Sequence, residues 1–116
     1  FFAGALAMGA DGAIGSTYNL TADVTNQITR AFRAGEMPRA REIQWQFNLF
    51  REQLIKLGGY QSIKRCFTLM GIDAGSCRPP YALLGSDADP HLRRVLAMLE
   101  DMRRKWNLHM PSVPCE

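Results

Sequence analysis

Ser16 is the side chain whose surroundings most suggest chemistry. It lies in a run of small residues, Gly-Ala-Ile-Gly-Ser-Thr at positions 12–17, which follows an Asp-Gly turn and predicts one buried β-strand. Alternation along a strand places Ile14 and Ser16 on one face, and parallel α/β proteins carry functional groups at the carboxyl ends of strands. Because Gly15 would let a ligand approach the backbone, the Ser16 hydroxyl suits hydrogen bonding to a polar substrate; a purely structural serine is the equal alternative.

The lysines and histidines fit catalytic roles less well. Lys56 and Lys64 carry the amine that a Schiff base requires, but both fall on predicted helices away from the apolar faces, which favours surface positions. His91 and His109 have no acidic or cysteine partner at catalytic or metal-ligand spacing. Ser16 has no obvious base nearby, so it is not read as a nucleophile. The sequence predicts binding residues, with no catalytic group and no metal site.

The composition is that of a globular protein with little charge bias. The chain has 116 residues, of which 47% are hydrophobic and 22% charged, and its formal net charge is +3. Basic residues at positions 93–105 mark the last helix, but two acidic residues interrupt them, which favours a solvated helix face over a nucleic-acid surface. Three cysteines without metal-ligand spacing predict reduced thiols in a cytoplasmic protein. We expect neither nucleic acid nor a membrane as a partner.

The sequence predicts five helices around the predicted strand. Helical periodicity predicts them over about residues 1–8, 22–34, 38–57, 60–70 and 90–106, followed by a tail at 107–116. Trp45 and Leu49 fall beside the apolar seam of the longest helix and widen it, so we expect this helix to be covered on two sides. The seam itself consists of Ile43, Phe47, Phe50, Leu54 and Leu57.

A single β-strand is not stable without a neighbouring strand to pair with. Its backbone donors and acceptors stay unpaired, which is costly when they are buried, so residues 12–17 need neighbouring strands that these 116 residues do not contain. The chain also opens on an apolar helical segment without an initiator methionine or a basic signal-peptide region. Both observations predict that the chain begins inside a larger protein.

The segment Gly-Ala-Asp-Gly-Ala-Ile-Gly-Ser-Thr-Tyr-Asn at residues 9–19 closely resembles the last barrel strand of the N-acetylneuraminate lyases. These enzymes belong to the dihydrodipicolinate synthase superfamily of Schiff-base aldolases. The resemblance continues through short motifs at residues 34–36, 40–48, 57–59, 63–64 and 77–80. The Ile-Gly-Ser-Thr-Tyr-Asn run at residues 14–19 is its most specific part and points to the sialate-lyase branch.

The resemblance implies an α/β fold, a (β/α)8 TIM barrel followed by a three-helix C-terminal bundle. Residues 1–35 would be the end of the barrel, with its last strand at about 12–17 and its last helix at about 22–34. Residues 36–106 would be the helical bundle, and 107–116 a tail. Because such a barrel needs about 250 residues, this mostly helical chain would be only the C-terminal portion.

The resemblance also implies which residues touch the substrate. Ser16 matches a serine that hydrogen-bonds a substrate hydroxyl, Tyr60 matches an aromatic residue that lines the pocket, and Ile14 would point into the barrel beneath the reacting centre. The lysine that forms the Schiff base, the assisting tyrosine, the carboxylate-binding Ser-Thr loop and a Gly-x-Asp-Glu segment would all lie before Phe1. No cofactor is implied, and family members are commonly homotetramers.

The sequence therefore predicts the C-terminal segment of an aldolase that cleaves N-acetylneuraminate, or a similar 2-keto sugar acid, to pyruvate and an aldose. This segment would supply part of the substrate pocket, would be inactive alone, and would have the rest of the barrel as its partner. One alternative is a sister enzyme that acts on 2-keto-3-deoxy sugar acids or resembles dihydrodipicolinate synthase. The other is a non-catalytic helical interaction module.

Overall fold

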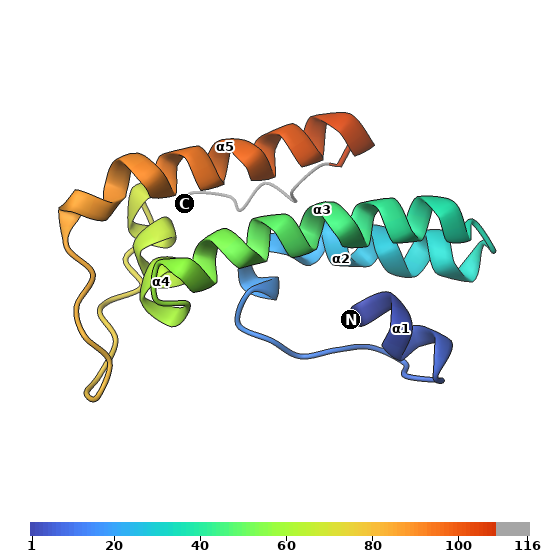
Figure 1. Cartoon of the computed structure of the whole chain (residues 1–116), viewed down its shortest axis with the longest axis horizontal. Coiled ribbons are helices and arrows are strands. Elements are labelled where there is room, and N and C mark those ends of the chain that lie inside the picture. The colour runs from blue at the N-terminus through green and yellow to red at the C-terminus, as the bar shows by residue number, and fades with distance from the viewer. Residues whose placement is uncertain (109–116) are drawn as a thin grey trace, which may run out of the picture.

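The computed structural model describes residues 1–108, which form helices and the loops between them (Figure 1). None of these helices combines the length and apolarity needed to cross a bilayer. Their order along the chain is α1 (Phe2–Ala7), α2 (Tyr18–Arg33), α3 (Met37–Lys56), α4 (Tyr60–Leu69), a 3-10 turn η1 (Ser86–Ala88) and α5 (Asp89–Trp106).

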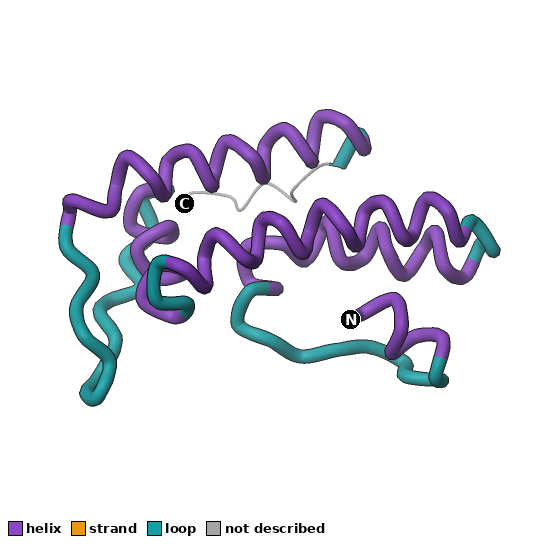
Figure 2. Tube along the Cα trace, in the orientation of Figure 1, coloured by secondary structure: helices purple, strands orange, loops and turns teal. Residues whose placement is uncertain are grey.

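The expected strand at residues 12–17 does not form. Residues 10–15 are an exposed loop that runs from the end of α1 to a turn at residues 16 and 17, and the described chain contains no strand (Figure 2). The reason is physical: a β-strand is stabilised by the ladder that it makes with a neighbour, and residues 1–108 supply no neighbour. The strand prediction is therefore wrong for this chain as it stands.

Helix α2 starts four residues earlier than its periodicity predicts. A kink at Thr21, whose φ is −134° and ψ is 23°, separates a first turn from the main helix. The Thr21 hydroxyl donates to the Thr17 carbonyl at 3.0 Å, which satisfies a backbone acceptor at the kink. At the other end Gly35, with φ of 76°, reverses the chain, so that α2 and α3 lie side by side (Figure 1).

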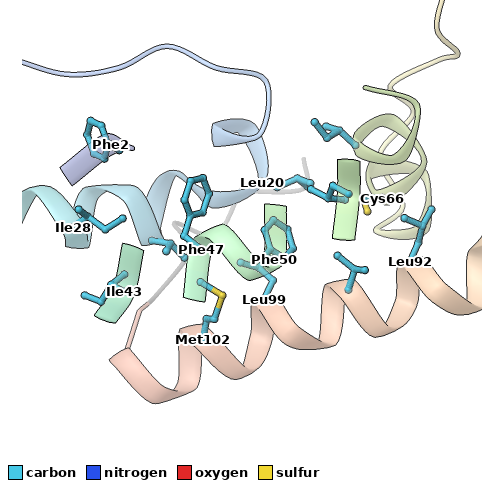
Figure 3. Packing of buried hydrophobic residues seen from close by; sticks show 14 of the residues in the cluster. Phe2, Leu20, Ile28, Ile43, Phe47, Phe50, Cys66, Leu92, Leu99 and Met102 are labelled. Atoms are coloured by element: carbon cyan, nitrogen blue, oxygen red, sulfur yellow. The ribbon is translucent and has the colours of Figure 1, made fainter. Parts of the chain in front are cut away.

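Helix α3 is the centre of the core, because it packs against all four of the other α-helices. Its seam residues Ile43, Phe50 and Leu54 are fully buried, as the 3–4 spacing predicts. Each fully buried aliphatic or aromatic side chain stabilises the fold by about 1.5–3 kcal/mol. Figure 3 shows this cluster, whose labelled members are Phe2, Leu20, Ile28, Ile43, Phe47, Phe50, Cys66, Leu92, Leu99 and Met102.

Helix α3 is covered on two sides, as expected, because it packs against both α2 and α5. The two residues that widen its seam are less covered than the seam itself, since Trp45 is 62% exposed and Leu49 is 37% exposed. Helix α5 lies along α3. Trp106, the last residue of α5, donates its indole N–H to Gln46 Oε1 of α3 at 3.1 Å. Periodicity showed that these apolar residues share a face, but it does not say whether a neighbour covers that face.

Two glycines and one hydroxyl set the turn between α3 and α4. Gly58 and Gly59 adopt φ values of 98° and 68°, which L-residues rarely reach, and end α3. The buried Ser62 hydroxyl lies 2.8 Å from the Leu54 carbonyl and 2.6 Å from the Gly59 carbonyl, and its single proton is shared between these two acceptors. These bonds fix where α4 begins, and they turn Ser62 and Cys66 toward the core, a face that the apolar pattern of α4 did not indicate.

Arg103 departs from the solvated basic face that was expected for the last helix. Its side chain is only 7% exposed, and its guanidinium donates to Asp23 Oδ2 at 2.7 Å, Glu100 Oε1 at 2.6 Å and the Leu20 carbonyl at 2.9 Å. Burial lowers the pKa of Arg103, but the bonds to Asp23 and Glu100 raise it and prevail, so the group stays charged. The arginine therefore ties α5 to the start of α2.

Loss of this arginine should destabilise the fold. Arg103→Met keeps much of the apolar stem but leaves the carboxylate of Asp23, itself 7% exposed, buried without its cation. Removing one partner of a buried pair costs about 3–5 kcal/mol, and urea denaturation followed by circular dichroism measures it.

Arg104→Met is the matched control, because Arg104 is 78% exposed and pairs at the surface with Asp101. Its effect should stay within about 0.5 kcal/mol. Equal losses for the two variants would contradict the importance of the buried pair.

The burial of Cys66 should make its thiol unreactive. Cys66 is fully buried in α4, and this burial raises its pKa to about 11. At pH 8 on the order of one such thiol in a thousand is ionised, so iodoacetamide should label half-buried Cys77 before Cys66, as peptide mapping can follow. In denaturing urea both peptides should be labelled alike, and comparable native rates would contradict the packing of α4.

Candidate functional site

A groove of about 710 Å³ runs between the loop before α2, helix α3 and the first residue of α4. Three predicted site residues, Ile14, Ser16 and Tyr60, all line it. A second hollow of about 420 Å³ shares Ser16, Tyr60 and Arg51 with the first and extends past Gly59. The fold thus brings together residues that are up to 46 positions apart in sequence (14 to 60) on one surface.

Ser16 is held by the turn that begins α2. The Tyr18 N–H donates to the Gly15 carbonyl at 3.1 Å, and Asn19 Nδ2 donates to the Ser16 carbonyl at 3.0 Å. Tyr18 in turn packs between Phe2 and Phe47, with ring centroids 6.0 and 6.1 Å away. The half-buried Ser16 side chain is therefore carried by a turn that is anchored on the core.

Gly15 is required by this packing. A Cβ added at Gly15 would lie 3.3 Å from the Tyr18 ring, closer than most such contacts allow. The Tyr18 ring cannot retreat freely, because it packs between two other aromatic rings. The glycine before Ser16 thus permits the turn as well as an open approach to the groove.

Ile14 lies in a different environment from the one expected. Its side chain is fully exposed on the loop, at 105% of its reference area, and Phe1 beside the groove is equally exposed. Neither has an apolar neighbour that covers it within the described residues. Exposed apolar groups around a concave surface are typical of a face that meets another part of a protein.

The groove also contains polar residues that the sequence did not single out. Asn48, Arg51 and Glu52 line it from α3, and Glu52 forms an ion pair with Lys56 at 2.8 Å. Their 3–4 spacing with Ile55, another lining residue, is a helical signal that was available in the sequence. This spacing does not by itself indicate a site, because these residues lie off the apolar seam of the helix.

The aromatic side of the second hollow is a pair of tyrosines, Tyr60 and Tyr81. The Tyr60 and Tyr81 rings meet edge to face, with centroids 5.6 Å apart and planes at 78°. Tyr60 opens α4, and Tyr81 comes from the long loop between α4 and η1. Tyr81 was not predicted, since a loop residue shows no periodicity that would assign it to a site.

The reactive side chains elsewhere have structural or surface positions. Lys64 Nζ donates to two backbone carbonyls, at 2.9 and 3.1 Å, and exposed Lys56 pairs with Glu52. His91 lies 3.4 Å from an arginine nitrogen at the surface, and His109 lies outside the described residues. Within residues 1–108, no three potential metal ligands cluster and no lysine lines the groove. The groove can bind through hydroxyl, amide, charge and aromatic contacts.

The sequence and fold of this chain are similar to those of known proteins. Residues 1–99 match the Dihydrodipicolinate synthetase family. The N-acetylneuraminate lyase of Haemophilus influenzae is 35% identical over 102 residues, which cover 88% of this chain and 33% of that protein. Among solved structures, a sialic acid aldolase from Ruminococcus gnavus aligns with a TM-score of 0.83 and 25% identity, over 89% of this chain and 35% of that one.

A structure of N-acetylneuraminate lyase from Fusobacterium nucleatum complexed with pyruvate is also similar, with a TM-score of 0.67 and 31% identity over 89% of this chain and 33% of that one. This chain spans about a third of the length of the relatives that it matches. The resemblance seen in the sequence is thus confirmed: the chain belongs to the Dihydrodipicolinate synthetase family of proteins.

Proposed function

We propose that this chain is the C-terminal part of a Schiff-base aldolase that cleaves N-acetylneuraminate, or a similar 2-keto sugar acid, to pyruvate and an aldose. The observation that carries the proposal is the shared groove, in which Ser16 and Tyr60 stand together on a chain that matches N-acetylneuraminate lyases. Similarity to a lyase solved with pyruvate supports pyruvate as the three-carbon product.

In this proposal the groove binds the hydroxylated part of the substrate. The Ser16 hydroxyl hydrogen-bonds a sugar hydroxyl, and the Tyr60 ring packs against the carbon chain. The lysine that attacks the keto group, and the groups that move protons, belong to the preceding part of the polypeptide. Within the described residues this chain therefore binds and orients, and it leaves the covalent step to the rest of the protein.

The same proposal accounts for the unpaired loop and the exposed apolar groups. Residues 12–17 become the last barrel strand when neighbouring strands complete the ladder, and Ile14 then points into the barrel. Residues 1–35 end the barrel and residues 36–106 form the helical bundle. Closing the barrel would cover Phe1 and Ile14, which are fully exposed in this chain. We further propose a cytoplasmic homotetramer.

Trapping of the Schiff base tests the reaction class. The protein expressed from its complete coding sequence should form a covalent adduct with pyruvate in the presence of borohydride, since reduction makes the imine permanent. Mass spectrometry should place the adduct outside residues 1–108. The 116-residue chain alone should form the adduct much more slowly than the complete protein. A complete protein that gives no adduct would refute the aldolase proposal.

Replacement of Ser16 tests the binding role. Ser16→Ala in the complete protein should raise KM for N-acetylneuraminate by about fivefold, the equivalent of one hydrogen bond of about 1 kcal/mol. The pyruvate adduct should form as in the wild type, because in this proposal the preceding part of the polypeptide binds the keto-acid end.

Ser86→Ala, at an exposed serine in η1, is the control and should change neither value. An unchanged KM for Ser16→Ala would return Ser16 to a structural role. A lower KM for a shorter 2-keto-3-deoxy sugar acid than for N-acetylneuraminate would favour the sister enzyme instead.

A further inference from the structure

Tyr81 forms one side of the hollow that carries Ser16 and Tyr60. Its ring stands edge-on to that of Tyr60, with centroids 5.6 Å apart. Such pairs are attractive because the partly positive ring edge meets the negative face of its partner. Both rings are about half exposed, Tyr60 at 52% and Tyr81 at 47%. Because little of the core surrounds them, their mutual contact orients the two rings.

The loop that carries Tyr81 is fastened to α4 by a lysine. Lys64 Nζ donates to the carbonyls of Ala74 at 2.9 Å and Ser76 at 3.1 Å. Lys64 lies one helical turn after Tyr60. The start of the loop is therefore held against the same helix that presents the Tyr60 ring.

The far end of the loop is fastened to α4 as well. The Arg65 guanidinium forms two hydrogen bonds of 2.7 Å with the carboxylate of Asp89, the first residue of α5. These bonds lower the pKa of Asp89, so the pair stays charged at neutral pH. With both ends fixed on α4, the loop returns past Tyr60 and places Tyr81 against it.

We propose that Tyr81 is a positioning residue of the sugar-acid site: it holds the Tyr60 ring as a fixed wall of the groove beside Ser16. This inference rests on the proposed function, which assigns Tyr60 and Ser16 to the substrate. A fixed ring favours a substrate whose hydroxylated chain is long enough to reach it. Tyr81 thereby determines preference for substrate length and takes no part in the covalent step.

Kinetics of the complete protein test this role. Tyr81→Ala removes the edge-to-face contact and should raise KM for N-acetylneuraminate about two- to tenfold. The value of kcat and the rate of borohydride trapping with pyruvate should not change, because pyruvate lacks the hydroxylated chain that this proposal places against Tyr60. The KM for a six-carbon 2-keto-3-deoxy sugar acid should change less than that for the nine-carbon substrate.

Two further variants separate positioning from general damage to the loop. Tyr81→Phe keeps the ring and should restore the wild-type KM. Leu83→Ala alters the same loop at a side chain that is 75% exposed and lies outside the groove, and it should behave as the wild type.

The outcomes distinguish failure of this inference from failure of the proposed function. If the wild type cleaves the sugar acid but Tyr81→Ala leaves KM and the length preference unchanged, the role of Tyr81 is refuted while the proposed function stands. Equal KM increases for Leu83→Ala and Tyr81→Ala also refute it. A wild type that gives neither cleavage nor adduct overturns the proposed function and this inference together. Independently of activity, NMR of the 116-residue chain should show nuclear Overhauser contacts between the two rings, and their absence overturns the inference.

Discussion

The fold depends most on the buried contact between Arg103 and Asp23, because it joins residues 80 positions apart and closes the bundle. A charge at this depth is tolerated only when several acceptors surround it, and here two carboxylates and the Leu20 carbonyl do so. Leu20 lies four residues after Ser16. The arginine of the last helix therefore holds the turn that presents the serine to the groove.

One kind of hydrogen bond occurs at three places in the fold. In each, a side chain donates to a backbone carbonyl at a point where the chain changes direction. Arg103 does so for the start of α2, Ser62 for the turn between α3 and α4, and Lys64 for the loop that carries Tyr81. Each bond satisfies an acceptor that a helix end or a loop leaves open. Three separate segments of chain are thus fixed by polar bonds in addition to the apolar core that they share.

The helices are largely predictable from the sequence, because glycines such as Gly35 and the 3–4 apolar spacing are local signals. The structure places Ser16 and Tyr60 on one groove, whereas their grouping in the sequence came only from resemblance to a family. Arg103 was assigned to a solvated face because charge patterns do not reveal a partner 80 residues away. The strand at residues 12–17 failed for a similar reason, since a strand is defined by its neighbours, and Tyr81 was missed because loops carry no periodicity.

The turn that Ser62 stabilises affects how substitutions can alter such a protein during evolution. It sets the direction of α4, and Tyr60 is the first residue of that helix, so substitutions in the bundle core that tilt α4 displace the ring. In the proposed enzyme the reacting groups belong to a different part of the polypeptide. Substrate preference and bond-breaking chemistry are then encoded in separate stretches of sequence, and mutations in one can be selected without impairing the other.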